Sequence, residues 1–309
     1  MPVDNQSTHD ALAAIRTDGL TKRFGKLTAV RGVDLRVARG EVVGFLGPNG
    51  AGKTTTIRML LGFLRPTAGS CRVLGGSLAS DVSLRRRVGY LPGDFRVDPG
   101  MTAHDLFVWF GRLRGGLHKG RLEELLNRLE LDQGRPFGTL SKGNRQKVGL
   151  VQAFMSDPEV LILDEPTSGL DPLVQREFLG MVSEAAARGA AVLFSSHVLP
   201  EVERVADRMA IIREGRLVGS GPVRELLDRT RHRLELRFAA DVHRGLFAGV
   251  PGVAELELHG ATAVVAVDGP VGPVLKAALR GPRLLTVRPA GDDLEDLFLS
   301  IYRRNDQGR

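Results

Sequence analysis

The residues best suited to chemistry lie in segment 41–56, EVVGFLGPNGAGKTTT. An apolar run precedes a glycine-rich turn and a helix-compatible stretch follows it, which predicts a strand, a loop and a helix. Gly47, Gly52, Lys53 and Thr54 satisfy the spacing G-x-x-x-x-G-K-[ST], in which backbone N–H groups of the loop face the phosphates of a nucleotide. The helix that begins near Lys53 directs the positive end of its dipole at the same phosphates. The segment therefore predicts a phosphate-binding loop.

Particular residue types are needed within this loop. Lys53 would reach the β- and γ-phosphates, and the Thr54 hydroxyl would bind Mg²⁺. Glycine is needed at Gly47, Gly50 and Gly52, because a side chain there would fill the space of the phosphates. From ordinary glycine usage, the whole pattern is expected by chance in a chain of this length about once in a hundred. We therefore prefer a phosphate-binding loop to an ordinary turn.

Polar side chains also follow two later apolar runs. Asp164 and Glu165 come directly after VLIL (residues 160–163), and His197 follows AVLFSS (residues 191–196). In open α/β sheets, ligands bind beyond the carboxyl ends of the strands. Asp164 suits Mg²⁺ held through its water shell, and Glu165 suits a general base beside the γ-phosphate. His197 could bond the γ-phosphate or the attacking water; a lone histidine is more often structural, but its position at a strand end favours function.

Phe24 allows two interpretations. It is the one aromatic residue in its region and directly precedes Gly25. An aromatic ring there could stack on adenine, whereas burial in a core is the usual role of phenylalanine. The local sequence leaves these two interpretations about even.

Composition limits the class of protein. A chain of 309 residues, 42% hydrophobic and 26% charged, can bury one large domain and a small one. The net charge of +7 suits an anionic partner such as nucleotide, inner-leaflet lipid or nucleic acid, without choosing among them. The single cysteine, Cys71, fits a reducing cytoplasm. The sequence contains no apolar run of eighteen residues and its first ten residues do not form a signal peptide, so we expect a soluble chain whose membrane role comes through a partner.

The remaining periodicities predict the organisation of the chain. Residues 1–11 are expected to be a disordered lead-in, and residues 15–24 and 29–37 to be antiparallel strands. An inserted helical subdomain at about 95–158 is expected from the helical spacing in 103–113 and 121–131. Buried strands separated by helices then predict an α/β core. These strands and the clearest of the helices are expected at 160–163, 190–195, 209–212 and 172–187.

A second anion-binding segment is LSKGNRQKVGLV, residues 140–151. Ser141 can cap a helix that begins near Asn144, and Gly143 permits close backbone approach. The helix N-terminus then offers a second anion site. One γ-phosphate does not need two such sites from a single chain, so we expect another copy to supply one of them.

Together, the motifs GPNGAGKTT, LSKGNRQ, VLILDEPTSGLDP and SSH resemble the nucleotide-binding subunit of an ATP-binding cassette (ABC) transporter, in the order of that family. The resemblance covers roughly residues 12–228 and implies an α/β P-loop fold with a mixed-sheet core, an antiparallel β subdomain and an inserted helical subdomain. It implies ATP hydrolysis with Mg²⁺ and a head-to-tail dimer, formed with a second copy or a homologous subunit, that encloses two ATP molecules. It also implies a membrane-spanning permease as partner at the cytoplasmic face of a bacterial membrane, and no nucleic acid.

The resemblance also implies roles for individual residues. Thr54 and Asp164 would bind the metal, and Glu165 and His197 would be catalytic. Residues Ser168–Asp171 would communicate between the two sites. The signature segment, residues 140–144, would contact ATP held by the partner subunit. Phe24 falls at the position of the aromatic residue that stacks on adenine. The implied nucleotide-binding residues are Phe24, Gly47, Pro48, Asn49, Gly50, Ala51, Gly52, Lys53, Thr54, Thr55, Ser141, Gly143 and Asp171.

The chain departs from the family pattern in two places. The signature LSKGN carries Asn144 where glutamine is commonest, and Lys142 adds a cation that we expect beside the phosphate. Gly93 stands where the family has a glutamine that senses Mg²⁺ and signals to the membrane subunit. Our hypothesis is that Asp94 or a water substitutes, with looser coupling.

Residues 232–309 are expected to form a second, small α+β domain of ferredoxin-like type without catalytic residues. The ending GDDLEDLFLSIYR resembles the tail of cassettes that serve exporters of the drug-efflux and antibiotic-resistance type, which implies export. The expected strands are 233–238, 254–258, 262–267 and 284–287, and the expected helices are 271–279 and 292–302.

Two other functions compete with transport. A cassette ATPase acting on ribosomes or DNA usually carries two cassettes or a long coiled coil, whereas Lys53 and Ser141 are only 88 residues apart and no second P-loop occurs. A non-hydrolysing regulator would not need Glu165 and His197. We therefore favour a transport ATPase.

Overall fold

The computed structural model describes residues 13–228 and 232–290. The expected disordered lead-in (1–11) and the expected helix 292–302 lie outside the described residues. Contacts divide the chain into two compact units, residues 1–220 and 221–309. Among the described residues, no helix has the length and apolar character that crossing a membrane requires.

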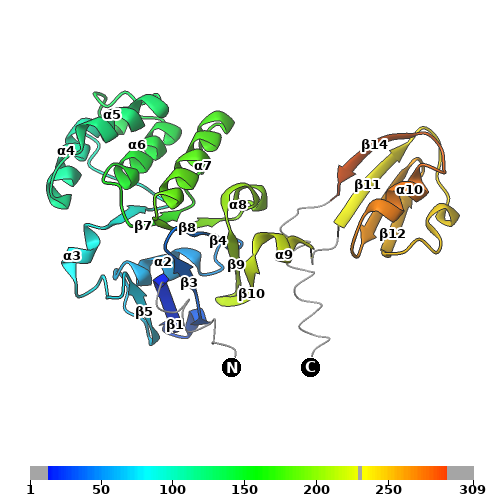
Figure 1. The fold of residues 1–309 in the computed structure, drawn as a ribbon, viewed down its shortest axis with the longest axis horizontal. Helices are drawn as coiled ribbons and strands as arrows, with labels where there is room; N and C mark the ends of the chain where they lie inside the picture. The colour runs from blue at the N-terminus through cyan, green and yellow to red at the C-terminus, as the bar shows by residue number, and fades with distance from the viewer. Residues whose placement is uncertain (1–12, 229–231, 291–309) are drawn as a thin grey trace. The chain divides into compact units, whose positions relative to one another are not determined.

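A six-stranded sheet forms the centre of the first unit, and Figure 1 shows it with helices α2, α6 and α7 nearby. Strands β4, β7 and β8 are buried along their whole length, as expected for parallel strands covered on both faces. Parallel pairing joins β9 to β4, β4 to β8, β8 to β7 and β7 to β6. This confirms the predicted α/β core. The sheet order is β10 (Arg216–Pro222), β9 (Arg208–Arg213), β4 (Val42–Leu46), β8 (Ala191–Ser196), β7 (Val160–Asp164) and β6 (Val88–Leu91).

The helices that connect these strands carry the candidate motifs at their N-terminal ends. Helix α2 follows the glycine-rich loop, α6 follows the signature segment, and α7 matches the predicted range 172–187. Helix α8 and strand β10 were not predicted from the sequence. The helices are α2 (Lys53–Leu60), α6 (Lys142–Phe154), α7 (Pro172–Ala187) and α8 (Leu199–Val205).

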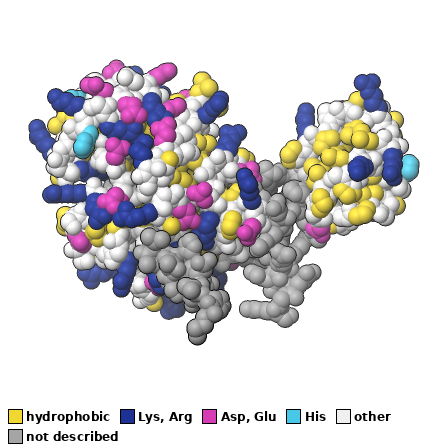
Figure 2. Space-filling model, viewed as in Figure 1, with side chains coloured by type: hydrophobic (Ala, Val, Ile, Leu, Met, Phe, Trp, Pro, Cys, Tyr) yellow, Lys and Arg dark blue, Asp and Glu magenta, His cyan; other side chains and the backbone are white. Residues whose placement is uncertain are grey.

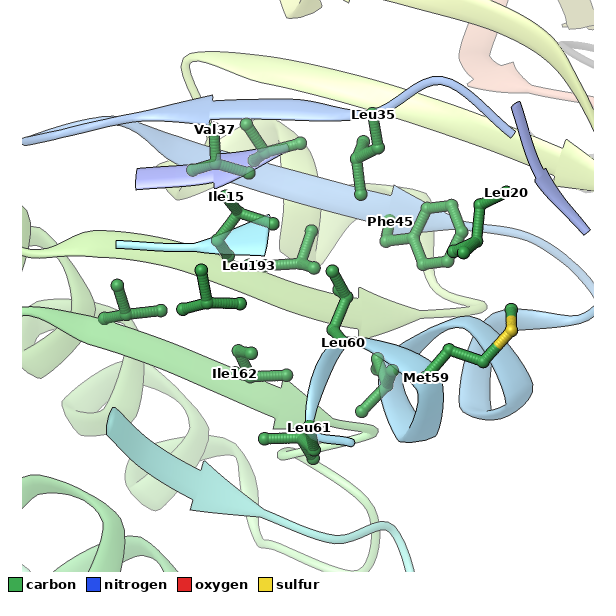
Figure 3. Close-up of a cluster of buried hydrophobic side chains, with 14 of the residues drawn as sticks. Ile15, Leu20, Leu35, Val37, Phe45, Met59, Leu60, Leu61, Ile162 and Leu193 are labelled. Carbon is green, nitrogen blue, oxygen red and sulfur yellow. The ribbon is translucent and has the colours of Figure 1, made fainter. Parts of the chain in front are cut away.

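A second, antiparallel sheet packs on this core through a shared cluster of apolar side chains. Figure 3 shows Ile15 and Val37 of this sheet on the same cluster as Phe45 and Leu193 of the central sheet. The predicted strand 29–37 is divided in two, because the Thr17 hydroxyl donates to Val33 O and accepts from Leu35 N, both at 2.8 Å. The strands are β1 (Ala13–Phe24), β2 (Leu27–Val33), β3 (Arg36–Ala38) and β5 (Ala68–Val73).

The inserted helices lie between β6 and β7 in the sequence, as predicted. Thr102 caps α4 in a capping box with Asp105, which fixes where that helix begins. Leu122, Leu125 and Leu126 of α5 are buried, in agreement with the predicted helical spacing. These elements are α4 (Ala103–Arg114), α5 (Lys119–Arg128) and the 3₁₀ helix η1 (Phe137–Thr139), whereas the short helix α3 (Val82–Arg85) precedes β6.

The second unit contains a four-stranded sheet in the order β12-β13-β11-β14, with every neighbouring pair antiparallel. This is the strand order of the ferredoxin-like fold, with the 3₁₀ helix η2 in the place of the first crossover helix. Leu236, Phe238, Val265 and Val274 form its core. Its elements are α9 (Val223–Asp228), β11 (His232–Phe238), η2 (Arg244–Phe247), β12 (Val253–His259), β13 (Thr262–Val267), α10 (Gly272–Ala278) and β14 (Leu284–Pro289).

Candidate nucleotide-binding site

The glycine-rich loop between β4 and α2 forms a bare backbone cradle. Gly50 and Gly52 have φ angles of 80° and 111°, a left-handed conformation that favours glycine. A Cβ at Gly47 would lie 2.4 Å from the carbonyl oxygen of Ile212. At Gly52 it would lie 2.7 Å from the carbonyl oxygen of Ala29. The loop conformation therefore requires glycine at these positions, as the sequence predicted.

Lys53 lies at the first position of α2 and its side chain is only 6% exposed. Its ammonium group donates to the carbonyl oxygens of Gly47 (2.5 Å) and Pro48 (3.2 Å). The same nitrogen lies 3.1 Å from Oε1 of Glu165. The structure thus brings the predicted lysine and the predicted base together across the loop.

Asp164 ends β7 and is 2% exposed. One carboxylate oxygen, Oδ2, accepts from the Thr54 hydroxyl at 2.7 Å. The other, Oδ1, accepts from the Ser195 hydroxyl at 2.6 Å. The two predicted metal ligands, Thr54 and Asp164, are therefore in direct contact.

Glu165 has a strained backbone, with a φ angle of 49° that is uncommon for any residue except glycine. Its Oε2 lies 2.6 Å from Nδ1 of His197, a half-exposed histidine directly after β8. Its Oε1 is buried and, although close to Lys53, accepts no aligned hydrogen bond. One carboxylate oxygen is therefore held, and the other has hydrogen-bonding capacity left.

Two residues that sequence reasoning missed hold the backbone at this point. The Ser195 hydroxyl accepts from the N–H of Glu165 at 2.9 Å, and Gln146 of α6 donates to the carbonyl oxygens of Glu165 (3.3 Å) and Pro166 (2.9 Å). Ser195 was visible only as part of an apolar strand ending in serines. Gln146 lies in the motif LSKGNRQ, but nothing in the sequence gives its partner.

The signature segment lies against the Ser168–Asp171 loop. Ser141 caps α6 by accepting from Asn144 N at 3.2 Å, so the helix begins at Lys142, earlier than the predicted start near Asn144. The Lys142 ammonium donates to the Ser168 hydroxyl at 3.0 Å, within the same chain. In the described part of the chain, Ser141 makes no hydrogen bond to the glycine-rich loop.

Two more residues of this region are placed by close contacts. A Cβ at Gly143 would lie 2.9 Å from the carbonyl oxygen of Gly169, so the two segments need glycine to approach this closely. Asp171 caps α7 by accepting from the N–H groups of Leu173 and Val174 at 3.0 Å each. These hydrogen bonds hold the pKa of Asp171 below its usual value. Asp171 is thus ionised at the N-terminus of its helix.

Phe24 lies at the end of β1 and is 46% exposed, so it is not a core residue. The Lys22 ammonium lies 5.2 Å from the centroid of its ring. An exposed aromatic ring beside a cation can stack on a planar ligand.

Gly93 lies beside the Asp164 carboxylate. A Cβ at Gly93 would lie 3.6 Å from Oδ2 of Asp164. Asp94 instead forms an ion pair with Arg96 at 2.7 Å, and its side chain is 70% exposed. In this structure the Asp94 carboxylate binds Arg96, and the hypothesis that Asp94 or a water takes the place of the missing side chain stays a prediction.

A glycine-rich loop at the carboxyl end of a parallel strand, with a buried lysine, two strand-end carboxylates and a histidine, defines the class of P-loop ATPases. Comparison with known proteins narrows the class. Residues 30–168 match the ABC transporter domain family. The Nod factor export ATP-binding protein I of Burkholderia lata is 34% identical, over 96% of this chain and 99% of the relative.

Other relatives and solved structures agree. The bacitracin transport ATP-binding protein BcrA of Bacillus licheniformis is 33% identical, over 93% of this chain and 96% of its own length. A solved ATP-binding subunit of an ABC transporter is 31% identical, with a TM-score of 0.66, over 69% of this chain and 91% of that structure. The dimeric structure of a bacterial ABC transporter cassette, 22% identical over 68% of this chain and 98% of that one, shares the fold with a TM-score of 0.62. The chain belongs to the ABC transporter family, as an ATP-binding ATPase subunit.

Proposed function

We propose that this chain hydrolyses ATP to energise export through a separate membrane-spanning permease. The convergence of Lys53, Asp164, Glu165 and His197 at the carboxyl edge of the central sheet is the observation that carries the ATPase half of this proposal. Export rests on the relatives. They include the Nod factor export and bacitracin transport proteins, and the daunorubicin/doxorubicin resistance ATP-binding protein DrrA of Streptomyces peucetius, 39% identical over 69% of this chain and 66% of its own length.

The P-loop residues 47–55 would bind the triphosphate through backbone N–H groups, while Lys53 leaves the loop carbonyls to contact the β- and γ-phosphates. Thr54 and Asp164 would hold Mg²⁺, which fits the oxygen ligands that this ion prefers. Bound there, Mg²⁺ would neutralise charge on the phosphate oxygens. Phe24 would stack on the adenine.

Glu165 would act as the general base. Its buried Oε1 accepts no aligned hydrogen bond and lies next to Lys53, where the γ-phosphate would be bound. That oxygen would accept the proton of the attacking water, while His197 holds the other oxygen and fixes the direction of the carboxylate. The two carboxylate oxygens of Glu165 would thus have different roles: Oε2 is held by His197, and Oε1 accepts the proton.

Ser141, Gly143 and Asp171 would act in a head-to-tail dimer with a second copy or a homologous subunit. Ser141 is exposed at the N-terminus of α6, and Asp171 is exposed at the N-terminus of α7. The N-terminus of α6, with the Ser141 hydroxyl and the close backbone at Gly143, suits the phosphates of a nucleotide bound by the facing subunit. The Asp171 carboxylate, which caps α7, would contact that nucleotide away from its phosphates, because like charges repel.

A groove of about 760 Å³ beside the inserted helices would receive the permease at the cytoplasmic face of the membrane. Arg114 lies in its wall, donates to the carbonyl oxygens of Gln152 and Val88, the hydroxyl of Ser156 and the side-chain amide of Gln152, and has no carboxylate partner among the described residues. Burial lowers the pKa of Arg114 to about 10, so it still carries its charge. An amphipathic helical segment with an acidic side chain fits such a groove. The apolar and basic lining includes Phe63, Val82, Trp109, Leu113, Arg85 and Arg96.

Nucleic acid is not the expected partner. Lys and Arg side chains are interspersed with acidic ones over the face of the first unit seen in Figure 2. Sequence-independent binding to a phosphate backbone uses a gathered basic surface instead. The face seen in Figure 2 therefore gives no support to the ribosome or DNA alternative.

Recovery of partners tests the proposal. Tagged Glu165→Gln protein, purified from its native cell with ATP present, is expected to bring down a multi-span membrane protein. Lys53→Ala protein serves as the control that binds nucleotide poorly and should recover less of it. Recovery of ribosomal proteins or DNA in its place would overturn the transport reading and leave the ATPase chemistry standing.

The groove is tested in the same experiment. Trp109→Glu adds a negative charge to the groove wall and is expected to lose the membrane partner while keeping basal ATP hydrolysis. Leu279→Glu, at an exposed leucine of the second unit, is the matched control and should retain it. Equal recovery by the two variants would exclude the groove as the docking site.

A further inference from the structure

The strained backbone of Glu165 needs other contacts to maintain it. A non-glycine residue at φ 49° lies in the sparsely populated left-handed region, where its Cβ crowds the backbone, and persists only where surrounding groups fix it. Asp164 precedes it in a regular strand and Pro166 follows it. The peptide groups on both sides of Glu165 are therefore the places to look for what fixes it.

Ser195 fixes the N-terminal side. The pairing of β7 with β8 places Ser195 opposite Asp164, and Ser195 is fully buried. Its hydroxyl donates to Oδ1 of Asp164 at 2.6 Å and accepts from the N–H of Glu165 at 2.9 Å. One hydroxyl thus uses its donor on the carboxylate beside Thr54 and an acceptor position on the next peptide.

Gln146 fixes the C-terminal side. Its amide is 5% exposed and donates to the carbonyl oxygens of Glu165 and Pro166, at 3.3 and 2.9 Å. The Glu165 carbonyl also accepts from the N–H of Ser168 at 3.2 Å, whereas no other donor to the Pro166 carbonyl is found among the described residues. Removal of the amide would therefore leave the buried Pro166 carbonyl without a partner, which is costly. Gln146 belongs to α6, whose N-terminus is Ser141, so the same helix connects the signature segment to the Glu165 peptide.

We propose that Gln146 and Ser195 are positioning residues that clamp the Glu165 peptide from its two sides and so aim its carboxylate oxygen Oε1, the one beside Lys53. This inference rests on the proposed role of Glu165 as the general base. Neither residue needs to contact nucleotide. A carboxylate moved by about 1 Å from its productive position can lose on the order of 100-fold in rate, so the clamp acts on turnover and not on binding.

The clamp also gives the signature segment a route to the base. A shift of α6 along its axis moves the Gln146 amide, and with it the carbonyl of Glu165. Closure of a second subunit onto Ser141 would therefore change the position of the Glu165 carboxylate through the buried amide of Gln146.

Gln146→Leu and Ser195→Ala test the proposal in the full-length chain, by single-turnover hydrolysis and by equilibrium binding of a fluorescent ATP analogue. We expect hydrolysis to fall by about 10- to 100-fold in each variant, with affinity for the analogue changed less than about threefold. Both variants are also combined with Glu165→Gln, and the combinations are expected to be no slower than Glu165→Gln alone. Thermal unfolding of each variant establishes how much folded protein is compared.

Matched controls exist on the same two elements. Gln152 is a second buried amide of α6, which faces the carbonyl of Tyr90 and the guanidinium of Arg114. Ser196 is the neighbouring buried hydroxyl on β8, and it donates to Glu201 at 2.7 Å. Gln152→Leu and Ser196→Ala remove equivalent polar groups without touching the Glu165 peptide, and are expected to keep single-turnover rates within about threefold.

The outcomes separate this inference from the proposed function. If hydrolysis is slow in Glu165→Gln but normal in Gln146→Leu and Ser195→Ala, the clamp is overturned and the assignment of Glu165 as the general base stands. Normal hydrolysis in Glu165→Gln would overturn the assignment of Glu165 as the general base. Two further results would mean a structural role only and would also overturn the clamp. One is a loss of hydrolysis rate that adds fully to that of Glu165→Gln in the combined variants. The other is an equal loss in Gln152→Leu and Ser196→Ala.

Discussion

Carboxylates lie at both ends of the strands of the central sheet, and the two ends, here the amino edge and the carboxyl edge, differ in how these carboxylates are hydrogen-bonded. At the amino edge, Glu159 accepts from Arg87 (2.7 Å at Oε2) and pairs with Arg39 at 2.8 Å, and Asp207 accepts from Val42 N at 2.9 Å. At the carboxyl edge, Glu165 keeps one buried oxygen without an aligned hydrogen bond and has a strained backbone.

This difference separates stability from function within one sheet. Each of these carboxylates at the amino edge accepts a hydrogen bond from a donor of the protein. The carboxyl edge keeps unused capacity and strain, which surrounding structure must support and which suits a reaction site. Substitutions at the carboxyl edge should therefore alter activity more than stability, and those at the amino edge the reverse.

The largest expected effect is that of Glu165→Gln. General bases typically contribute about 10²- to 10⁴-fold, and glutamine cannot accept the proton, so turnover should fall by that order while ATP remains bound. A phosphate-release assay together with size-exclusion chromatography in ATP measures both, and the variant is expected to accumulate as a dimer. Near-normal turnover would remove Glu165 from the catalytic role.

Lys53→Ala should act on binding. A charge-assisted hydrogen bond contributes about 1.5–3 kcal/mol, so affinity for ATP should weaken roughly 10- to 100-fold. Isothermal titration with a non-hydrolysable ATP analogue gives the value. Unchanged affinity would contradict the assignment of the phosphate-binding loop.

Gly93→Gln should have a smaller effect at the same edge. The new Cβ fits at 3.4 Å from the carbonyl oxygen and 3.6 Å from the carboxylate of Asp164, so the fold accepts it. An added hydrogen bond of about 1 kcal/mol predicts that half-maximal activity is reached at a roughly fivefold lower Mg²⁺ concentration. If the Mg²⁺ dependence and the stimulation by a membrane partner both stay the same, position 93 has no functional role in this chain.

Glu159→Gln tests the amino edge. The Arg87 hydrogen bond lowers the pKa of Glu159 to about 2, so this carboxylate stabilises the fold above its unfolded pKa of about 4.5 and loses that contribution as pH falls toward 2. We expect the variant to lose less than about 1 kcal/mol at neutral pH, because partly exposed ion pairs are screened by solvent. Urea unfolding at pH 7 and pH 3 should show a smaller pH dependence than the parent chain, with ATPase activity unchanged. A larger loss of activity than of stability would contradict the division between the two edges.

The sequence predicted the components of the site better than the contacts between them. Glycine at positions 47, 50 and 52 and the buried runs before Asp164 and His197 leave a clear local signal, because backbone geometry and strand burial restrict residue type. Helix 172–187 was predicted as a stretch that separates two buried strands, and the structure shows that Asp171 caps it and Pro172 lies in its first turn.

The missed features depend on partners far away in the sequence. Ser195 acts through the register that pairs it with Asp164, and Gln146 acts through a carbonyl on another element. The break between β2 and β3 similarly depends on the Thr17 hydroxyl of another strand. Within this chain the Lys142 ammonium donates to the Ser168 hydroxyl at 3.0 Å, a contact that the sequence did not indicate, and its expected place beside a phosphate stays a prediction.

The contacts of Lys53 have a consequence for selectivity among the anions of the cell. The ammonium group is already surrounded by two carbonyl oxygens and a carboxylate, and it is almost completely buried. Chloride or a single phosphate ion gains little by displacing them, because it replaces existing partners one for one. A triphosphate makes many contacts along the loop at once and can displace all three. We therefore expect the loop to bind a triphosphate in preference to the abundant small anions.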